Sequence, residues 1–248
     1  PHIPPSTPSS AASDVYKRQH PHIGLSTLTY LFAGRIVHRD STGAVATIEP
    51  GAVNWMTAGG GVTHTERSHP DDVTTLRSLR GLQTWVALPR DHEDGSAFFE
   101  HTPADVIGEL DGPPGVRLVA GTGWSIESPV GVSSPLVLAE VRPTETSPIA
   151  IDPLHPERAV LAVDGDVRLG DTVLHPGQLA VLERGTQPMV EGDGRAMLLG
   201  GEPVGGRTIW WNFVHSDRDR IEQAKADWAQ QRFPTVPGDH DPWVPLPR

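Results

Sequence analysis

The sequence predicts an all-β protein: two antiparallel β-barrels in tandem, followed by a C-terminal α-helix. Short runs rich in β-branched and aromatic residues alternate with turns along most of the chain, as in barrels and sandwiches. The 26 glycines and 25 prolines among 248 residues supply those turns. A helical period is confined to one segment near the C-terminus. A chain of this length can bury a substantial core.

The first barrel is predicted within residues 20–112. Its strands are expected at residues 27–32, 35–40, 44–49, 53–57, 62–66 and 81–88. The glycines at 59–61 would let the chain turn sharply before the strand at 62–66. Residues 1–19 are rich in Pro and Ser and then abruptly basic, so we expect a disordered arm foreign to the fold. Residues 89–115 are expected to form an acidic loop that leads to the domain boundary.

The second barrel is predicted within residues 113–248, together with the helix and an extended tail. Its strands are expected at residues 116–120, 135–141, 158–163, 173–174, 179–182 and 196–199. A weak internal repeat, in which a strand is followed by a hairpin and a Pro-Gly pair, suggests duplication. The helix is expected to start at Ser216, with Asp219 completing a capping box. Trp210 and Trp211 are expected to pack at a domain interface.

Composition excludes several classes of function. A formal net charge of -11 disfavours attraction to nucleic acid or to anionic lipid. The absence of cysteine removes disulfides and thiolate chemistry. No window approaches the roughly 18 apolar residues of a membrane span, and no apolar signal core opens the chain. We therefore expect a cytoplasmic protein with no direct nucleic-acid or membrane partner.

Two triplets carry the strongest chemical signal: His20-Pro21-His22 and His64-Thr65-Glu66. Side chains at positions i and i+2 of a strand point to the same face, so each triplet presents two donors in one direction. If the two strands face each other, three imidazoles and one carboxylate converge. Donors of this type suit divalent first-row metals and leave positions for oxygen or a chelating substrate. We therefore predict a metal site.

The competing interpretation is that His20 and His22 are polar residues at the start of a strand. The second triplet, after a glycine-rich turn, favours the metal interpretation. We expect His38 to be a surface residue or a neighbour of the ligands. Four further histidines are expected in solvated loops or element ends: His69, His92, His101 and His215. The second repeat has no such triplet and is expected to bind no metal.

The runs HPHIGLSTLTYLFAGRIVHRDSTG, IEPGAVNWMTAGGGVTHTE and LRGLQTWVALP resemble the pirin family of the cupin superfamily. The tail EPVGGRTIWWNFVHSDRDRIEQAKADWAQQRFP is similar to the C-terminal end of bacterial pirin-like proteins. The resemblance implies a bicupin with one iron in the N-terminal barrel, held by His20, His22, His64 and Glu66. Ser26 stands where a typical cupin has a ligand glutamate. Residues 1–19 do not resemble the strands that precede the H-P-H motif in the family.

The resemblance also implies activity. The leading hypothesis is an Fe(II)-dependent dioxygenase of the quercetin 2,3-dioxygenase type, which takes a flavonol and O2 as substrates, with Mn, Co, Ni or Cu as other candidate metals. In it Glu66 is a catalytic residue that accepts the substrate's proton. One alternative is a non-enzymatic, redox-sensitive regulator that acts by contact with a protein partner. Another is a barrel that stores metal.

Overall fold

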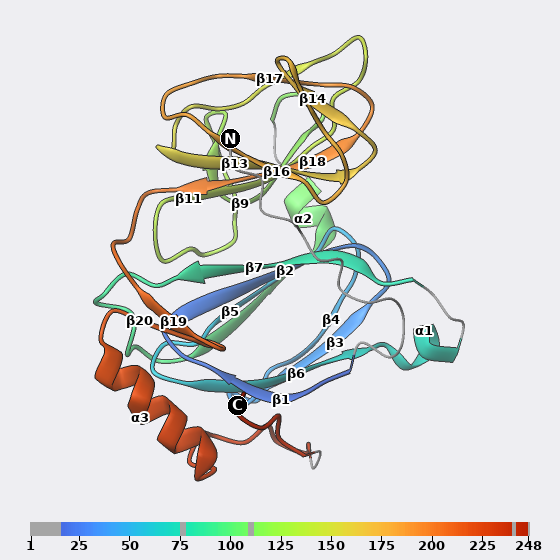
Figure 1. Cartoon of the computed structure of the whole chain (residues 1–248). Coiled ribbons are helices and arrows are strands. Elements are labelled where there is room, and N and C mark those ends of the chain that lie inside the picture. The colour runs from blue at the N-terminus through green and yellow to red at the C-terminus, as the bar shows by residue number, and fades with distance from the viewer. Residues whose placement is uncertain (1–15, 75–77, 109–111, 240–241, 248) are drawn as a thin grey trace. The chain divides into compact units, whose positions relative to one another are not determined.

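The computed structural model describes residues 16–74, 78–108, 112–239 and 242–247. The fold is the predicted one: two cupin-type barrels of antiparallel strands and a C-terminal helix (Figure 1). Contacts divide the described residues into two compact units. One combines the residues up to 105 with those from 204 onward, and the other holds 106–203. The predicted domains were residues 20–112 and 113–248, whereas the contacts divide the chain after residues 105 and 203 and group the C-terminal segment with the first barrel.

The first unit contains two four-stranded antiparallel sheets. One has the order β1 (Tyr16–His22), β6 (Val62–Ser68), β3 (Ile36–Asp40) and β4 (Val45–Ile48). The other has the order β7 (Arg80–Ala87), β2 (Leu25–Ala33), β5 (Val53–Thr57) and β8 (Phe98–Thr102). A short helix, α1 (Pro70–Thr74), follows β6. The predicted strands are therefore present.

In this barrel the sequence pattern missed one whole strand and the beginning of another. β1 begins at Tyr16, inside the expected disordered arm, and pairs with β6 through a register that places His20 opposite His64. β8 lies inside the expected acidic loop and pairs with β5. Neither has a clean alternation of apolar and polar residues. The histidine triplet of β1 was expected on a strand, and the missed part is residues 16–19, which follow the Pro- and Ser-rich segment.

The glycine cluster turns the chain as predicted. Gly59 has a φ of +50°, and a Cβ there would lie 2.0 Å from the carbonyl oxygen of Gly95. Only glycine satisfies both conditions without displacing backbone. The turn reverses the chain before β6. This strand then pairs antiparallel with β1, in a register that places His64 opposite His20.

The second unit contains a six-stranded and a four-stranded sheet. The larger has the order β10 (Ile126–Glu127), β9 (Val116–Gly123), β11 (Leu136–Val141), β18 (Arg195–Gly201), β13 (Glu157–Asp164) and β16 (Leu179–Leu182). The smaller has the order β12 (Ile149–Ala150), β17 (Met189–Glu191), β14 (Val167–Leu169) and β15 (Thr172–Leu174). The helix α2 (Ala104–Gly108) begins before the division between the units. An aliphatic core that includes Leu118, Val160 and Leu198 fills the second unit.

The C-terminal segment forms the hairpin β19 (Thr208–Trp210) and β20 (Phe213–His215), then the helix α3 (Arg218–Ala229). Asp217 caps the N-terminus of the helix: its side chain accepts a hydrogen bond from the backbone N–H of Asp219. This corrects the expected cap at Ser216, whose hydroxyl donates to Glu93 instead.

Apolar residues of α3 pack onto the first barrel. Ile221, Ala224 and Trp228 are buried in one cluster with Ile23 and Phe213. The contact explains why the helix belongs to the first unit: its apolar stripe covers Ile23, which directly follows the His20–His22 triplet.

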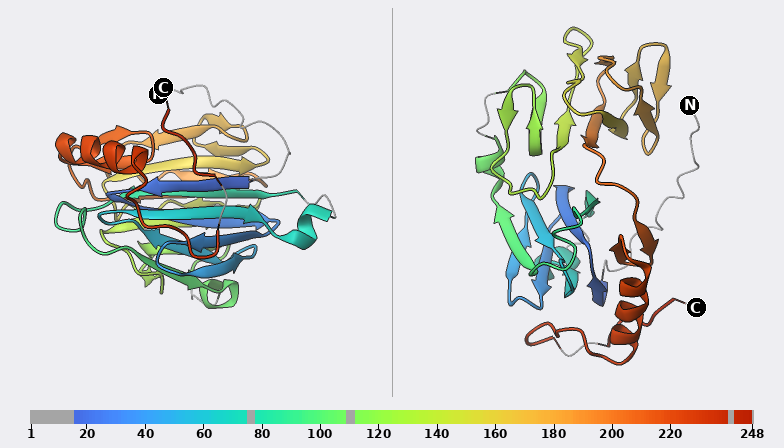
Figure 2. Two further views of the ribbon diagram at one scale, coloured as in Figure 1. Left: turned by 90° about the horizontal axis from the view of Figure 1, so that it is seen from below. Right: turned by 90° about the vertical axis from the view of Figure 1, so that its left-hand side faces the viewer.

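The tail after α3 runs across the strands of the first barrel, as the left panel of Figure 2 shows. Val244 donates its backbone N–H to the carbonyl of Gln19, and Trp243 stacks on Trp228 with ring centroids 4.2 Å apart. Among the described residues, no helix has both the length and the apolar character that crossing a membrane requires.

Candidate metal centre

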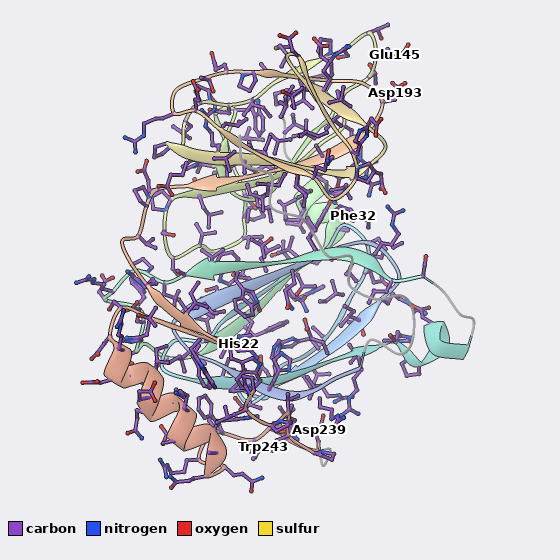
Figure 3. The ribbon with its side chains drawn as sticks, in the orientation of Figure 1. His22, Phe32, Glu145, Asp193, Asp239 and Trp243 are labelled. Carbon is purple, nitrogen blue, oxygen red and sulfur yellow. The ribbon has the colours of Figure 1, made fainter. Side chains whose placement is uncertain are left out.

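Three histidines meet inside the first barrel. His20 and His22 come from β1, and His64 from β6; all three side chains are buried. In Figure 3, His22 lies in the interior between the two sheets of this barrel. One ligand nitrogen from each of the three lies within 4.8 Å of the other two. The predicted convergence of the imidazoles is therefore present.

The spacing of the rings fits a shared metal ion. Nε2 of His22 lies 3.1 Å from Nε2 of His64. Two nitrogens bound about 2.1 Å from one ion lie about 3 Å apart when the angle at the ion is near 90°. Nδ1 of His20 lies 2.8 Å from the carbonyl oxygen of Arg18. A carbonyl can only accept, so Nδ1 carries the proton and Nε2 keeps its lone pair for a metal.

A buried His–Asp pair stands behind His64. The β3–β6 register places His38 opposite Glu66 and Asp40 opposite His64. Nδ1 of His38 lies 3.5 Å from Nδ1 of His64, and Nε2 of His38 lies 3.0 Å from Oδ2 of Asp40. Partners of this kind fix the orientation of a ligand imidazole.

Asp40 is built to stay ionised. Burial raises the pKa of this carboxyl group, but hydrogen bonds from His38 and from the hydroxyl and backbone N–H of Thr42 lower it, and the net pKa lies below the ordinary value. The residue is fully buried. A carboxylate fixed in this way holds the His38 ring in one orientation.

Glu66 stands at the edge of the histidine group. Its carboxylate belongs to a second group within 4.8 Å, which it forms with His38 and His64. Gln83 donates from Nε2 to Oε1 of Glu66 over 2.6 Å, and the hydroxyl of Thr29 donates to the same oxygen over 3.4 Å. His64 is therefore shared by two overlapping sets of candidate ligands.

A cavity of about 440 Å³ adjoins the histidines. This lies within the range of about 300–1,000 Å³ that is typical of small-molecule sites. Its lining is Arg18, His20, His22, Gln83, Trp85, Trp211, Asn212, Val244 and Pro245. A larger hollow of about 1100 Å³ lies in the second unit, but Glu127 is the one ionisable side chain in its described lining. Chemistry, not size, therefore marks the first cavity as the site.

Several other predicted positions have different environments. His38 is buried and adjoins His64, in agreement with its predicted role as a neighbour of the ligands. His92 and His101 are exposed. His215 was predicted to be solvated, but it is buried, 3.7 Å from Glu93. The prediction failed because the C-terminal segment folds back onto this loop.

Sequence reasoning missed Gln83, Trp85 and Trp211 as parts of the site. Gln83 and Trp85 stand two residues apart on β7, so they share a face, and this spacing was the available signal. Trp211 was predicted at a domain interface, but in the first unit it packs against Phe213 and Trp228. No spacing rule connects it to residues almost 200 positions earlier.

Comparison with known proteins agrees with this architecture. A pirin-like protein of Caulobacter vibrioides is 45% identical over 98% of this chain and 84% of that protein. The chain belongs to the pirin family. The pirin family model matches residues 3–86, and the model of the pirin C-terminal cupin domain matches residues 138–234. The first match extends into the segment expected to be foreign to the fold, which corrects that expectation.

Another curated protein and two solved structures are also similar to this chain. A Pseudomonas aeruginosa protein named "Putative quercetin 2,3-dioxygenase" is 36% identical over 85% of this chain and 67% of its own length. The crystal structure of quercetin 2,3-dioxygenase from Acinetobacter baumannii superimposes with a TM-score of 0.83 and 31% identity, covering 94% of this pirin and 79% of that chain. An Escherichia coli pirin in complex with nickel(II), at 19% identity and a TM-score of 0.59, covers 75% of this chain and 76% of its own and shows the shared fold.

Proposed function

We propose that this pirin is a metal-dependent dioxygenase that cleaves flavonol-like substrates with O2. The observation that carries the proposal is the buried group of three imidazoles beside a cavity large enough for a small aromatic molecule. Relatives that bear the name quercetin 2,3-dioxygenase support it.

The metal ligands in this proposal are His20, His22, His64 and Glu66. The donor set contains nitrogen and oxygen only, which suits Fe(II) and neighbouring ions of the first row. When bound, the ion would act as a Lewis acid that lowers the pKa of a coordinated flavonol hydroxyl. The His38–Asp40 pair would keep His64 oriented for ligation.

Glu66 would accept the proton of the flavonol hydroxyl. Gln83 and Thr29 donate to Oε1 and fix the orientation of the carboxylate. A general base must lie within hydrogen-bond reach of the proton that it takes. Gln83, which donates to Glu66, lines the cavity, so the carboxylate lies next to a residue of the cavity wall. Burial excludes bulk water from this position.

The test is flavonol consumption under air by protein reconstituted anaerobically with Fe(II), measured from the loss of flavonol absorbance and from oxygen uptake. Turnover that requires both metal and O2 is expected. A protein that holds stoichiometric metal and leaves flavonols unchanged would refute the enzymatic proposal. That result would favour a regulator whose binding to a protein partner depends on the metal's oxidation state.

A further inference from the structure

The turn between β19 and β20 contains an unusual residue. Trp211 and Asn212 join the two strands as a two-residue hairpin loop, with Trp210 paired to Phe213. Trp211 has a φ of +50°. A hairpin loop with positive φ at its first central position normally has glycine there. A tryptophan in this conformation is strained, and strain of this kind persists where the surrounding contacts hold it and is common at ligand sites.

The indole of Trp211 links the C-terminal segment to the metal cavity. On one side it contacts Phe213, at a ring-centroid distance of 5.7 Å, and Trp228, at 6.3 Å. It also contributes to the cavity lining with His20 and His22. The apolar cluster around α3 therefore fixes the ring from behind, while the ring forms part of the cavity wall.

A second indole lines the same cavity from the barrel. Trp85 on β7 is 41% exposed and lies edge-on to His22, with ring centroids 5.4 Å apart and an interplanar angle of 86°. A large apolar side chain that remains this exposed next to metal-site histidines is available to a ligand. The lining of the cavity thus includes two tryptophans, Trp85 and Trp211, beside the histidines His20 and His22.

We propose that Trp211 is a specificity-determining residue: with Trp85 it selects flat aromatic ligands over small aliphatic chelators. The inference deepens the proposed function, since it rests on the same cavity. Aromatic faces attract flat rings through offset or edge-to-face stacking, whereas an aliphatic chelator makes no such contact. Arg18, Gln83 and Asn212 supply polar groups that favour a ligand with oxygen atoms on its rim.

Trp210 offers a matched control. It is adjacent in sequence, stacks on Phe213 with centroids 6.1 Å apart and lies under the ammonium group of Lys225. It is absent from the described lining of the cavity. If the aromatic cluster has a purely structural role, substitutions of Trp210 and of Trp211 should affect ligand binding equally. If Trp211 determines specificity, only its substitution should weaken the binding of aromatic ligands.

The experiment measures binding and not turnover. Protein loaded with Zn²⁺, which has no redox chemistry, is titrated calorimetrically with quercetin and with oxalate. The variants are Trp211→Gly, which suits the positive φ, Trp211→Leu, Trp211→Phe and Trp210→Ala. We expect Trp211→Gly and Trp211→Leu to weaken quercetin binding about three- to tenfold, as the loss of one aromatic contact predicts. Oxalate binding should be unchanged, and Trp211→Phe and Trp210→Ala should behave as the parent.

Three results would overturn the inference: parental quercetin affinity in Trp211→Leu, an equal loss of quercetin and oxalate binding, or no quercetin binding by the Zn²⁺-loaded parent. Trp211→Leu keeps the test decisive if the glycine variant does not fold. The binding assay is independent of turnover. A protein that fails to oxidise flavonols but shows the tryptophan effect would refute the proposed activity and leave the inference intact.

Discussion

Nδ1 of His38 lies 3.5 Å from Nδ1 of His64, and the far nitrogen of His38 lies 3.0 Å from Asp40. His64 is the one residue shared by both groups of candidate metal ligands. The orientation of this ring therefore depends on a neighbour that lies outside the predicted ligand set. This dependence can be tested without changing any predicted ligand.

Asp40→Asn should weaken metal binding about 10- to 100-fold, because residues that orient metal-ligand imidazoles have effects of this size. Competition with a metal chelator measures the affinity. The matched control is Asp166→Asn, which alters an exposed pair in the other unit, where His175 lies 2.9 Å from the carboxylate. The control should bind metal as the parent does. Equal affinities for all three proteins would contradict the role assigned to the His38–Asp40 pair.

Glu66→Gln should keep most of the metal but lose flavonol turnover. The three histidines remain as ligands, whereas the amide cannot accept the substrate's proton as a base. General-base catalysis typically contributes about 10²- to 10⁴-fold, so a rate loss of this order is expected. Metal content and single-turnover flavonol consumption are measured on the same sample. A variant that keeps both metal and the parental rate would exclude the catalytic role of Glu66.

Glu93→Gln should destabilise the attachment of the C-terminal segment. Buried Glu93 faces the guanidinium of Arg207, which is itself almost fully buried, and accepts from the backbone and hydroxyl of Ser216. Loss of one partner leaves a buried charge, which costs about 3–5 kcal/mol. Denaturant unfolding measures the free-energy change.

The control for this change is Glu222→Ala, which removes an exposed pair with Lys225 on α3. Exposed helix pairs of this kind contribute about 0.3–0.5 kcal/mol. If Glu93→Gln costs no more than the control, the buried cluster does not hold the segment.

His101 should titrate below the ordinary histidine pKa of about 6.5. The residue as a whole is exposed, but partial burial of its ring lowers its pKa, and the charge of Glu49 opposes this only partly. Its Nδ1 also lies 2.6 Å from Oδ1 of Asn54. The folded state therefore binds the proton less readily than the unfolded state, so stability falls as pH drops from about 6.5 through the folded pKa. NMR titration of the ring should show this, and His101→Gln should flatten the matching part of the stability profile. A pKa at or above 6.5 would contradict the assignment.

Local sequence patterns predicted most strands, the glycine turn and the three histidines, because period-two spacing and turn chemistry are encoded within a few residues. The beginning of β1, residues 16–19, was missed because it follows a Pro- and Ser-rich segment and has no alternation of apolar and polar residues. β8 was missed because FFEHT lies in an otherwise polar segment. Six further strands were missed because, at two or three residues each, they are too short to show a period: β10, β12, β14, β17, β19 and β20.

The position of the C-terminal segment could not be read from periodicity. The apolar stripe of α3 predicted that the helix packs against something, but not against what. The packing partner depends on Glu93, which the sequence places in an ordinary acidic loop. In the structure this residue accepts a hydrogen bond from the backbone N–H of Ser216, 123 positions later. The place of Trp211 beside the cavity depends on the same return of the chain, whereas Gln83 donates to Thr29 and Glu66 within the barrel.

Metal analysis of His22→Ala beside the parent tests the central claim most directly. His22 supplies one of the three nitrogens in the buried group, and its Nε2 lies 3.1 Å from that of His64. Exposed His92→Ala is the matched control. After reconstitution with Fe(II) and removal of excess ion, the parent and the control should each hold about one ion per chain, and His22→Ala should hold a small fraction of that. Full occupancy in folded His22→Ala would contradict the histidine metal centre.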